Sequence, residues 1–122
     1  MSEAPSLCVL SIVIPSEPVP KARARTVRGH SYTPARTRVA QDAVAWHARQ
    51  SYRLSPMRGR VGIEIVFRCR SRRRCDVDNL AKLVMDGMNG ILYRDDSQID
   101  VLRIKRVHVD SGPCTVVTAW AV

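Results

Sequence analysis

The sequence predicts a small α+β domain, in which two helices pack on one face of a mixed β-sheet. Segments with strand periodicity alternate with two segments of helical periodicity, in the order β-α-β-α-β-β. The chain has 122 residues, the size of one domain, and contains no repeat and no long linker. The last two strands are separated only by the turn at residues 110–113, which predicts an antiparallel hairpin and excludes a doubly wound parallel fold.

The first half of the chain predicts a strand, a loop and a helix. Residues 7–14 are rich in β-branched side chains and read as a strand. Residues 16–34 combine several prolines with cationic side chains, which indicates an extended basic loop. Residues 35–51 have apolar side chains at helical spacing, so we expect an amphipathic helix. Its apolar, core-facing side is expected to carry Val39, Ala43 and Trp46, with Ala40 and Val44 alongside.

The second half predicts a strand, a helix and two more strands. Residues 60–68 alternate apolar and polar side chains, so one face of this strand, including Phe67, is expected to be buried. Residues 79–89 carry the apolar stripe of a second amphipathic helix. Residues 99–109 and 114–122 then form the final strands.

The composition indicates a nucleic-acid partner. The chain has 20 Lys and Arg residues against 11 Asp and Glu, a formal net charge of +9, and a small domain this basic usually binds a polyanion. No apolar run is long enough to span a membrane, and no basic segment precedes the first apolar run as in a secretion signal, so we expect a cytoplasmic protein. The four cysteines include no C-x-x-C pair, which favours buried or incidental thiols over a zinc site.

The acidic residues are concentrated directly after the most basic stretch of the chain. Carboxylates in this position would repel phosphate unless a divalent cation lay among them. We therefore expect a metal site in this region. Six of the 11 acidic residues belong to this stretch: Asp76, Asp78, Asp86, Asp95, Asp96 and Asp100.

The spacing of these residues predicts a site at the start of the second helix. Asp76 and Asp78 are two apart on a segment expected to be extended, so their side chains point the same way, and Lys82 follows one helical turn later. The pair Asp95-Asp96 could add one more carboxylate. Oxygen ligands without His or Cys suit Mg²⁺ or Mn²⁺, and carboxylates beside a lysine are suited to phosphodiester hydrolysis.

A purely structural interpretation of the same residues remains open. Asp78 could serve only as a helix N-cap. Lys82 and Asp86 could form only an i,i+4 surface pair, and Asp95-Asp96 could be turn residues.

Taken together, these motifs resemble the RusA-type Holliday-junction resolvases, from about Ile12 to the last strand. The matching strings are Pro20-Lys21-Ala22-Arg23, Tyr32-Thr33-Pro34, Asp76-Val77-Asp78-Asn79-Leu80-x-Lys82, Asp86, Asn89-Gly90 and Asp95-Asp96-Ser97-Gln98. The resemblance implies that residues 1–122 form a single RusA-like endonuclease domain. Family members are often carried by bacteriophages or prophages, and a nucleoid-associated enzyme is expected.

The resemblance also implies an activity and the residues that carry it. The family acts as Mg²⁺-dependent homodimers, for which Mn²⁺ is an expected substitute, and cuts four-way DNA junctions symmetrically in recombination and repair. Its essential metal-binding aspartates match Asp76, Asp78 and Asp96, and its catalytic lysine matches Lys82. Asp86 and Asp95 match family positions of secondary importance.

Two basic segments are expected to hold DNA phosphates, and Tyr32 and Tyr93 are candidates for contacting DNA. Such contacts position the backbone without reading sequence. Two alternatives stay open: a basic nucleic-acid-binding module without catalysis, and a structure-selective nuclease without junction preference. The expected DNA-binding residues are Lys21, Arg23, Arg25, Arg70, Arg72, Arg73 and Arg74.

Overall fold

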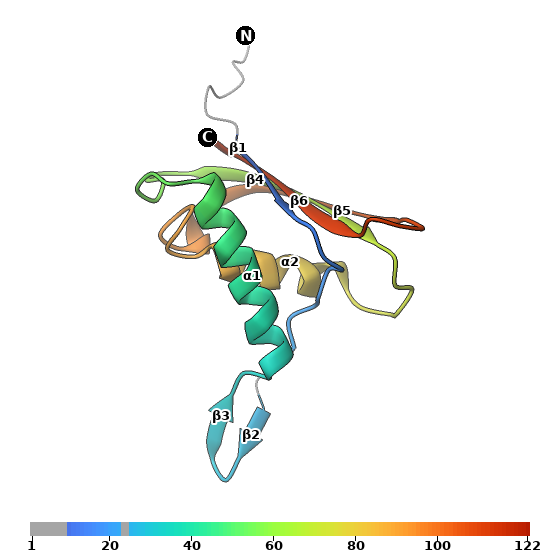
Figure 1. Ribbon diagram of the computed structural model, residues 1–122. Coiled ribbons are helices and arrows are strands. Elements are labelled where there is room, and N and C mark those ends of the chain that lie inside the picture. Colours follow the sequence, from blue (N-terminus) through green and yellow to red (C-terminus); the bar gives the residue numbers. More distant parts are fainter. Residues whose placement is uncertain (1–9, 23–24) are drawn as a thin grey trace.

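The computed structural model describes residues 10–22 and 25–122, and its elements form a four-stranded sheet, two helices and a separate hairpin (Figure 1). Both helices lie on the same face of the sheet, so the predicted α+β architecture is confirmed. In chain order the elements are β1 (Leu10–Ile14), β2 (Arg25–Val27), β3 (His30–Tyr32), α1 (Ala35–Ser51), β4 (Val61–Cys69), α2 (Val77–Met88), the 3₁₀ helix η1 (Asp96–Gln98), β5 (Ile99–His108) and β6 (Cys114–Ala121).

The sheet is mixed, as predicted, but its last two strands are not paired. The strand order is β1-β6-β4-β5, with β4 antiparallel to β6 and parallel to β5. The expected β5–β6 hairpin is therefore wrong, because β4 lies between the two strands. Strand β4 is buried along almost its whole length, whereas most residues of β5 are exposed or half-buried. An apolar strand gains most from a central position, and a charged strand is tolerated at an edge.

Helix α2 connects the two parallel strands and packs an apolar face on the sheet. Leu80, Leu83, Val84 and Met88 are all buried, in agreement with the predicted stripe. The helix begins two residues earlier than predicted. Its N-terminus follows the loop that leaves β4, so it lies at the end of the sheet where the carboxyl ends of β4 and β5 meet. This is the edge at which α/β sheets commonly place their ligands.

Helix α1 turns only part of its predicted apolar side to the core: Val44 is buried as expected, but the prediction is wrong for Val39 and Trp46. Val39 and Trp46 are 69% and 56% exposed, while Val44 and Ala48 are buried. The reason lies in α2, where Gly87 contacts Val44 so closely that a Cβ atom added to Gly87 would lie 2.8 Å from the Cβ of Val44. The two helices therefore meet through small side chains, and this contact selects the buried face of α1.

The core lies between the helices and the sheet. Phe67 is buried in β4, as predicted. Tyr93 and Leu92, from the loop after α2, are also fully buried. No helix in residues 10–22 and 25–122 combines the length and apolar character required to cross a bilayer.

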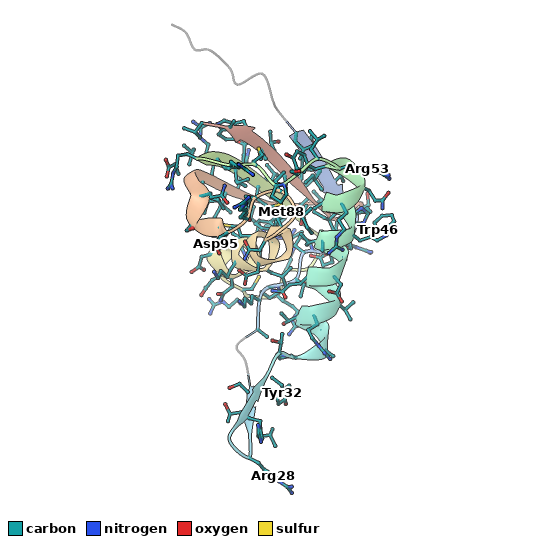
Figure 2. The ribbon with its side chains drawn as sticks, turned by 90° about the vertical axis from the view of Figure 1, so that its left-hand side faces the viewer. Arg28, Tyr32, Trp46, Arg53, Met88 and Asp95 are labelled. Carbon is teal, nitrogen blue, oxygen red and sulfur yellow. The ribbon has the colours of Figure 1, made fainter. Side chains whose placement is uncertain are left out.

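Strands β2 and β3 form a hairpin within the segment predicted to be an extended loop. Its turn places Arg28 at φ 50° and Gly29 at φ 80°, the left-handed conformations that tight hairpins require. The hairpin projects away from the sheet and helices (Figures 1 and 2). Arg23 lies outside the described residues, while Arg25 begins β2.

Candidate active site

The N-terminus of α2 carries Asp76 and Asp78, both of them exposed. Asp76 is the N-cap residue, and its backbone carbonyl accepts hydrogen bonds from the amides of Asn79 (3.1 Å) and Leu80 (3.2 Å). The carboxylate of Asp76 makes no capping hydrogen bond. Asp78 lies inside the first helical turn, so the prediction that Asp76 and Asp78 share one extended segment is wrong. The Oδ1 atom of Asp78 accepts the amide N–H of Asn79 at 3.0 Å.

The position of the helix N-terminus explains why carboxylates are stable there. Amide N–H groups and the helix dipole place partial positive charge at this end of α2. The interpretation of Asp78 as the N-cap is wrong, because Asp76 occupies that position. Since the Asp76 side chain does not cap the helix, it remains available to a ligand.

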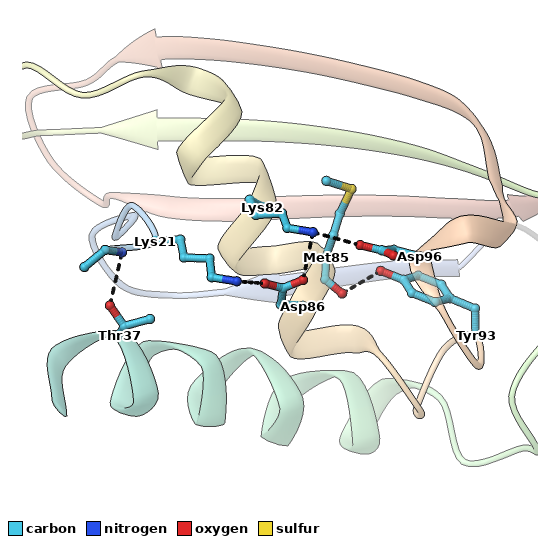
Figure 3. Close-up of polar contacts among 8 residues, drawn as sticks. Lys21, Thr37, Lys82, Met85, Asp86, Tyr93 and Asp96 are labelled. Carbon is cyan, nitrogen blue, oxygen red and sulfur yellow. Dashed lines mark hydrogen bonds and ion pairs between the residues drawn. The ribbon is translucent and has the colours of Figure 1, made fainter. Parts of the chain in front are cut away.

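Lys82 lies one turn further along α2 and contacts two carboxylates (Figure 3). Its Nζ atom is 3.2 Å from Oδ2 of Asp96 and 3.4 Å from Oδ1 of Asp86. The hydrogen bond to Asp96 and the charge of Asp86 raise the pKa of Lys82 above its ordinary value. Lys82 is therefore an ammonium group at neutral pH, held between α2 and η1.

Asp86 also pairs with Lys21, 65 positions away in the chain (Figure 3). The Asp86 side chain is only 18% exposed and binds two lysines, so its role is not limited to an exposed i,i+4 pair with Lys82. The backbone around Lys21 is held as well: its own N–H donates to the carbonyl of Asn79 at 3.0 Å, and the next amide donates to Oγ1 of Thr37 at 3.3 Å. The result is an alternating ion network in the order Lys21, Asp86, Lys82 and Asp96.

The loop before β5 separates the roles of its two adjacent aspartates. Asp95 caps η1, since its Oδ2 accepts the amide of Ser97 at 3.0 Å, and the Ser97 hydrogen bonds lower the pKa of Asp95. The side chain of Gln98 holds the loop from inside, accepting from the amides of Arg94 and Asp95 and donating to the carbonyls of two residues that precede β4. Asp96 is thereby left to face Lys82.

Tyr93 supports this loop from below rather than contacting DNA, so its predicted role is wrong. It is fully buried, and its hydroxyl donates to the backbone carbonyl of Met85 at 2.8 Å (Figure 3). Burial raises the pKa of Tyr93, and the nearby carboxylates add to the effect. Tyr32, on the projecting hairpin, is 46% exposed and stays a candidate for DNA contact.

The arginine-rich loop between β4 and α2 lies beside Asp76, as predicted. Glu17 anchors the start of this loop, because its Oε1 accepts the amides of Arg70 (3.1 Å) and Ser71 (3.2 Å). The sequence patterns missed Glu17, which no local motif singles out. A surface hollow next to Asp76 is lined by Arg72, Arg73, Arg74, Cys75, Asp76, Arg106 and His108.

Arg106 and His108 also lie at this site, although no sequence pattern singled them out. They come from the end of β5 and reach this loop because β4 and β5 are parallel, with Cys69 opposite His108. Arg106 donates from Nη1 to the backbone carbonyl of Cys75 at 2.7 Å, directly before Asp76. Only the strand pairing reveals this contact.

The carboxylates expected to bind metal differ in whether another side chain already binds them. Among the described residues, no three His, Cys, Asp or Glu side chains form a metal-binding group, so Asp76, Asp78 and Asp96 are not a preassembled cage. Mg²⁺ commonly binds one or two carboxylates and completes its shell with water and substrate phosphate. Asp76 and Asp78 fit that donor requirement, whereas Asp96 is engaged by Lys82.

Comparison with known proteins identifies a family for this fold and site. The family model described as "Endodeoxyribonuclease RusA" matches residues 15–119. The match includes both basic segments, the whole of α2 and the loop that carries Asp96. No curated protein matches the chain.

Proposed function

The chain belongs to the RusA endodeoxyribonuclease family, and on that premise we propose that it cuts four-way DNA junctions by paired, symmetric, Mg²⁺-dependent hydrolysis of phosphodiester bonds. The family itself implies a Holliday-junction-resolving endonuclease. Mg²⁺ as the cofactor, with Mn²⁺ as its substitute, the residues that bind it and the dimeric state are our proposals. The chemistry of the residues around α2 supports the metal and its ligands, and the exposed apolar face of α1 supports the dimer.

One observation carries the assignment. The carboxylate of Asp76, which makes no capping hydrogen bond, lies beside an arginine-rich hollow, at the start of the helix that also carries Lys82. A protein that only neutralises phosphate gains nothing from a free carboxylate at this position, because it would repel the ligand. A divalent cation reverses the local charge and turns the carboxylate into part of a phosphate-binding site.

In the proposed reaction, Asp76 and Asp78 hold the cation and Lys82 supplies a fixed positive charge. When bound, the metal would act as a Lewis acid on the phosphate and lower the pKa of a bound water molecule. Lys82 is suited to stabilising charge on the phosphate oxygens rather than to accepting a proton, because Asp96 and Asp86 keep it protonated. In this scheme Asp96 positions Lys82 through their ion pair. Asp96 is also the third aspartate, after Asp76 and Asp78, that we expect to bind the metal.

Paired cuts require two active sites, so we propose a homodimer. The outer face of α1 offers apolar surface for such a contact, because Val39 and Trp46 are exposed there, two turns apart. Analytical ultracentrifugation of the purified chain would test this state. A monomer at the concentrations that support paired cleavage would contradict it.

The nuclease assignment is tested by replacing Asp76 with Asn, which keeps the shape of the side chain and removes its charge. A labelled four-way junction and a matched linear duplex are incubated with and without Mg²⁺. We expect symmetric nicks confined to the junction, no nicks without metal, and a loss of cleavage in Asp76→Asn of at least about a hundredfold with junction binding retained.

The matched control is Asp100→Asn, in the same acidic stretch. Asp100 pairs with Arg60 on the surface, whereas Lys82 pairs with Asp86 and Asp96, so this variant should cleave like the wild type. Normal cleavage by Asp76→Asn would contradict the proposed site. Salt-sensitive binding of DNA by the wild type without any nicking would instead favour a nucleic-acid-binding module without catalysis, and equal cleavage of junction and other branched DNA would favour a structure-selective nuclease.

A further inference from the structure

A second cationic pocket adjoins the hollow that contains Asp76. It has a volume of about 100 Å³, and its charged rim comes from three separate parts of the chain. Arg36 contributes from the first turn of α1, Arg73 and Arg74 from the loop after β4, and Arg106 and His108 from the end of β5. Their convergence depends on tertiary structure alone.

Within the part of the chain that the structure describes, the arginines of this pocket have no carboxylate partner. In residues 10–22 and 25–122, the ion pairs within 4.0 Å involve Lys21, Arg60 and Lys82, and none involves an arginine of the pocket. Glu17 also lines the pocket, but its Oε1 is bound by two backbone amides of the loop. Four guanidinium groups around one Glu leave a surplus of positive charge, which an anion would neutralise.

The chemistry of the lining favours a phosphodiester over other anions. Guanidinium groups present planar donor pairs that match phosphate oxygens in bidentate geometry. The walls of the pocket include Pro18, Pro20 and Cys69, which supply apolar surface beside the charged rim. Such a mixture suits the phosphate and sugar of a nucleic-acid backbone.

The position of the pocket relates it to the candidate active site. The hollow beside Asp76 and this pocket share Arg73, Arg74 and Arg106, and Arg73 also lines a third hollow that reaches Arg36 and the start of α1. The three hollows therefore adjoin one another at these arginines. They lie in order from Asp76 toward α1, the helix that follows the projecting hairpin.

We propose that this pocket binds a backbone phosphate of the DNA strand that passes Asp76, at a position adjacent to the bond to be cut. The identity of the ligand rests on the proposed function, because that function makes DNA the substrate. The new element is a phosphate site that uses Arg36, Arg106 and His108 together with the arginine-rich loop. Arg106 has a further task here, because its bond to the Cys75 carbonyl ties the pocket to the residue before Asp76.

The test measures how DNA binding depends on salt. Binding of a fluorescent four-way junction is followed by anisotropy in EDTA, so that no strand is cut, over a series of salt concentrations. The double variant Arg36→Gln/Arg73→Gln should reduce the slope of log K against log salt by about 0.9 for each phosphate that the protein no longer neutralises. It should also weaken binding at low salt by at least about fivefold. Arg106 is kept, because removing it would also free the Cys75 carbonyl.

Two further variants separate a specific site from a general loss of charge or folding. Arg53→Gln removes an exposed arginine just beyond the other end of α1, where its side chain donates to Oε1 of Gln50, and should leave the slope unchanged (Figure 2). Arg36→Lys/Arg73→Lys keeps the charge and should retain most of the slope. Equal slopes for the wild type and Arg36→Gln/Arg73→Gln would overturn the proposal.

The outcomes also separate this inference from the proposed function. Cleavage of junctions by the wild type with an unchanged slope in the double variant would reject the pocket and leave the nuclease assignment intact. A reduced slope in a chain that never nicks DNA would support the pocket and reject the nuclease. An increase in Tm with inorganic phosphate that disappears in the double variant, with an unchanged DNA slope, would assign the pocket to a small anion and overturn our proposal.

Discussion

Replacing Tyr93 with Phe tests how the loop that carries Asp96 is supported. The Tyr93 hydroxyl is fully buried and donates to the carbonyl of Met85, one of the last carbonyls of α2, which lack partners within the helix. Removing the hydroxyl leaves this carbonyl without that donor, at a cost of about 2 kcal/mol of the free energy of unfolding. For a chain of this size, that change lowers Tm by roughly 8 °C.

The same substitution changes how stability depends on alkaline pH. Burial raises the pKa of Tyr93 above its ordinary value of 10.0, so the folded protein keeps the hydroxyl proton after the unfolded chain has lost it. This contribution to stability is complete below pH 10 and decreases above it, by about 1.4 kcal/mol for each pH unit. Tyr93→Phe should remove this part of the pH dependence.

The assay is urea unfolding followed by circular dichroism at pH 7 and at pH values between 9.5 and 11. Tyr52→Phe is the matched control, since the Tyr52 hydroxyl donates to the carbonyl of Ser55 in an exposed hydrogen bond and its loss should cost less than about 0.5 kcal/mol. Equal losses for the two variants at pH 7 would refute the reasoning, as would an alkaline slope that Tyr93→Phe leaves unchanged.

Two other predictions concern α2. Gly87→Ala should destabilise the fold by about 1 kcal/mol, because the new Cβ would lie 2.8 Å from the Cβ of Val44 and the clash exceeds the gain in helix propensity. The new Cβ would also lie 2.8 Å from Cγ1 of Val44, an atom that Val44→Ala removes. Urea unfolding of Gly87→Ala, Val44→Ala and the double variant should therefore show that the double loses less stability than the two single losses combined, and additive losses would contradict the close contact. Lys82→Gln should lower the single-turnover cleavage rate at least about a hundredfold while junction binding in EDTA falls less than tenfold. Equal losses in cleavage and binding would show that Lys82 only attracts DNA.

The local features of the fold were predictable because they depend on neighbouring residues. The bounds of α1 agree with the predicted helix at residues 35–51, and the apolar stripe of α2 is buried as expected. The orientation of α1 was not predictable, because its sequence presents more than one apolar stripe. The contact of Val44 with Gly87, from a helix 26 or more residues away in the chain, decides between the stripes.

The strand order is a second case in which a local signal misled. The turn between the last two strands is as short as in a hairpin, but β4 separates them. Strand β4 has one face that is buried along its whole length, whereas every residue of β5 is exposed or half-buried. This difference places β4 inside the sheet and β5 at its edge, and it is not local to the turn.

In the candidate site, too, spacing predicted some contacts and tertiary structure decided the others. The spacing of Lys82 and Asp86 predicted their contact, and the adjacent Asp95 and Asp96 could not be told apart by spacing. The capping of η1 by Asp95 assigns Asp96 to Lys82, and the fold brings Lys21 to Asp86 from 65 positions away.

The sequence by itself determined the basic character of the chain, the order along the chain of the two helices and of the four strands of the main sheet, and the motif that places carboxylates and a lysine along α2. These features follow from charge counts and from side-chain periods of two and 3.6 residues, which act within a few positions. Tertiary structure alone decided the inward face of α1, the central place of β4 and the pairing of Lys82 with Asp96. It also brought Arg36 and Arg106 to one pocket, because those choices depend on contacts between segments that only chain folding brings together.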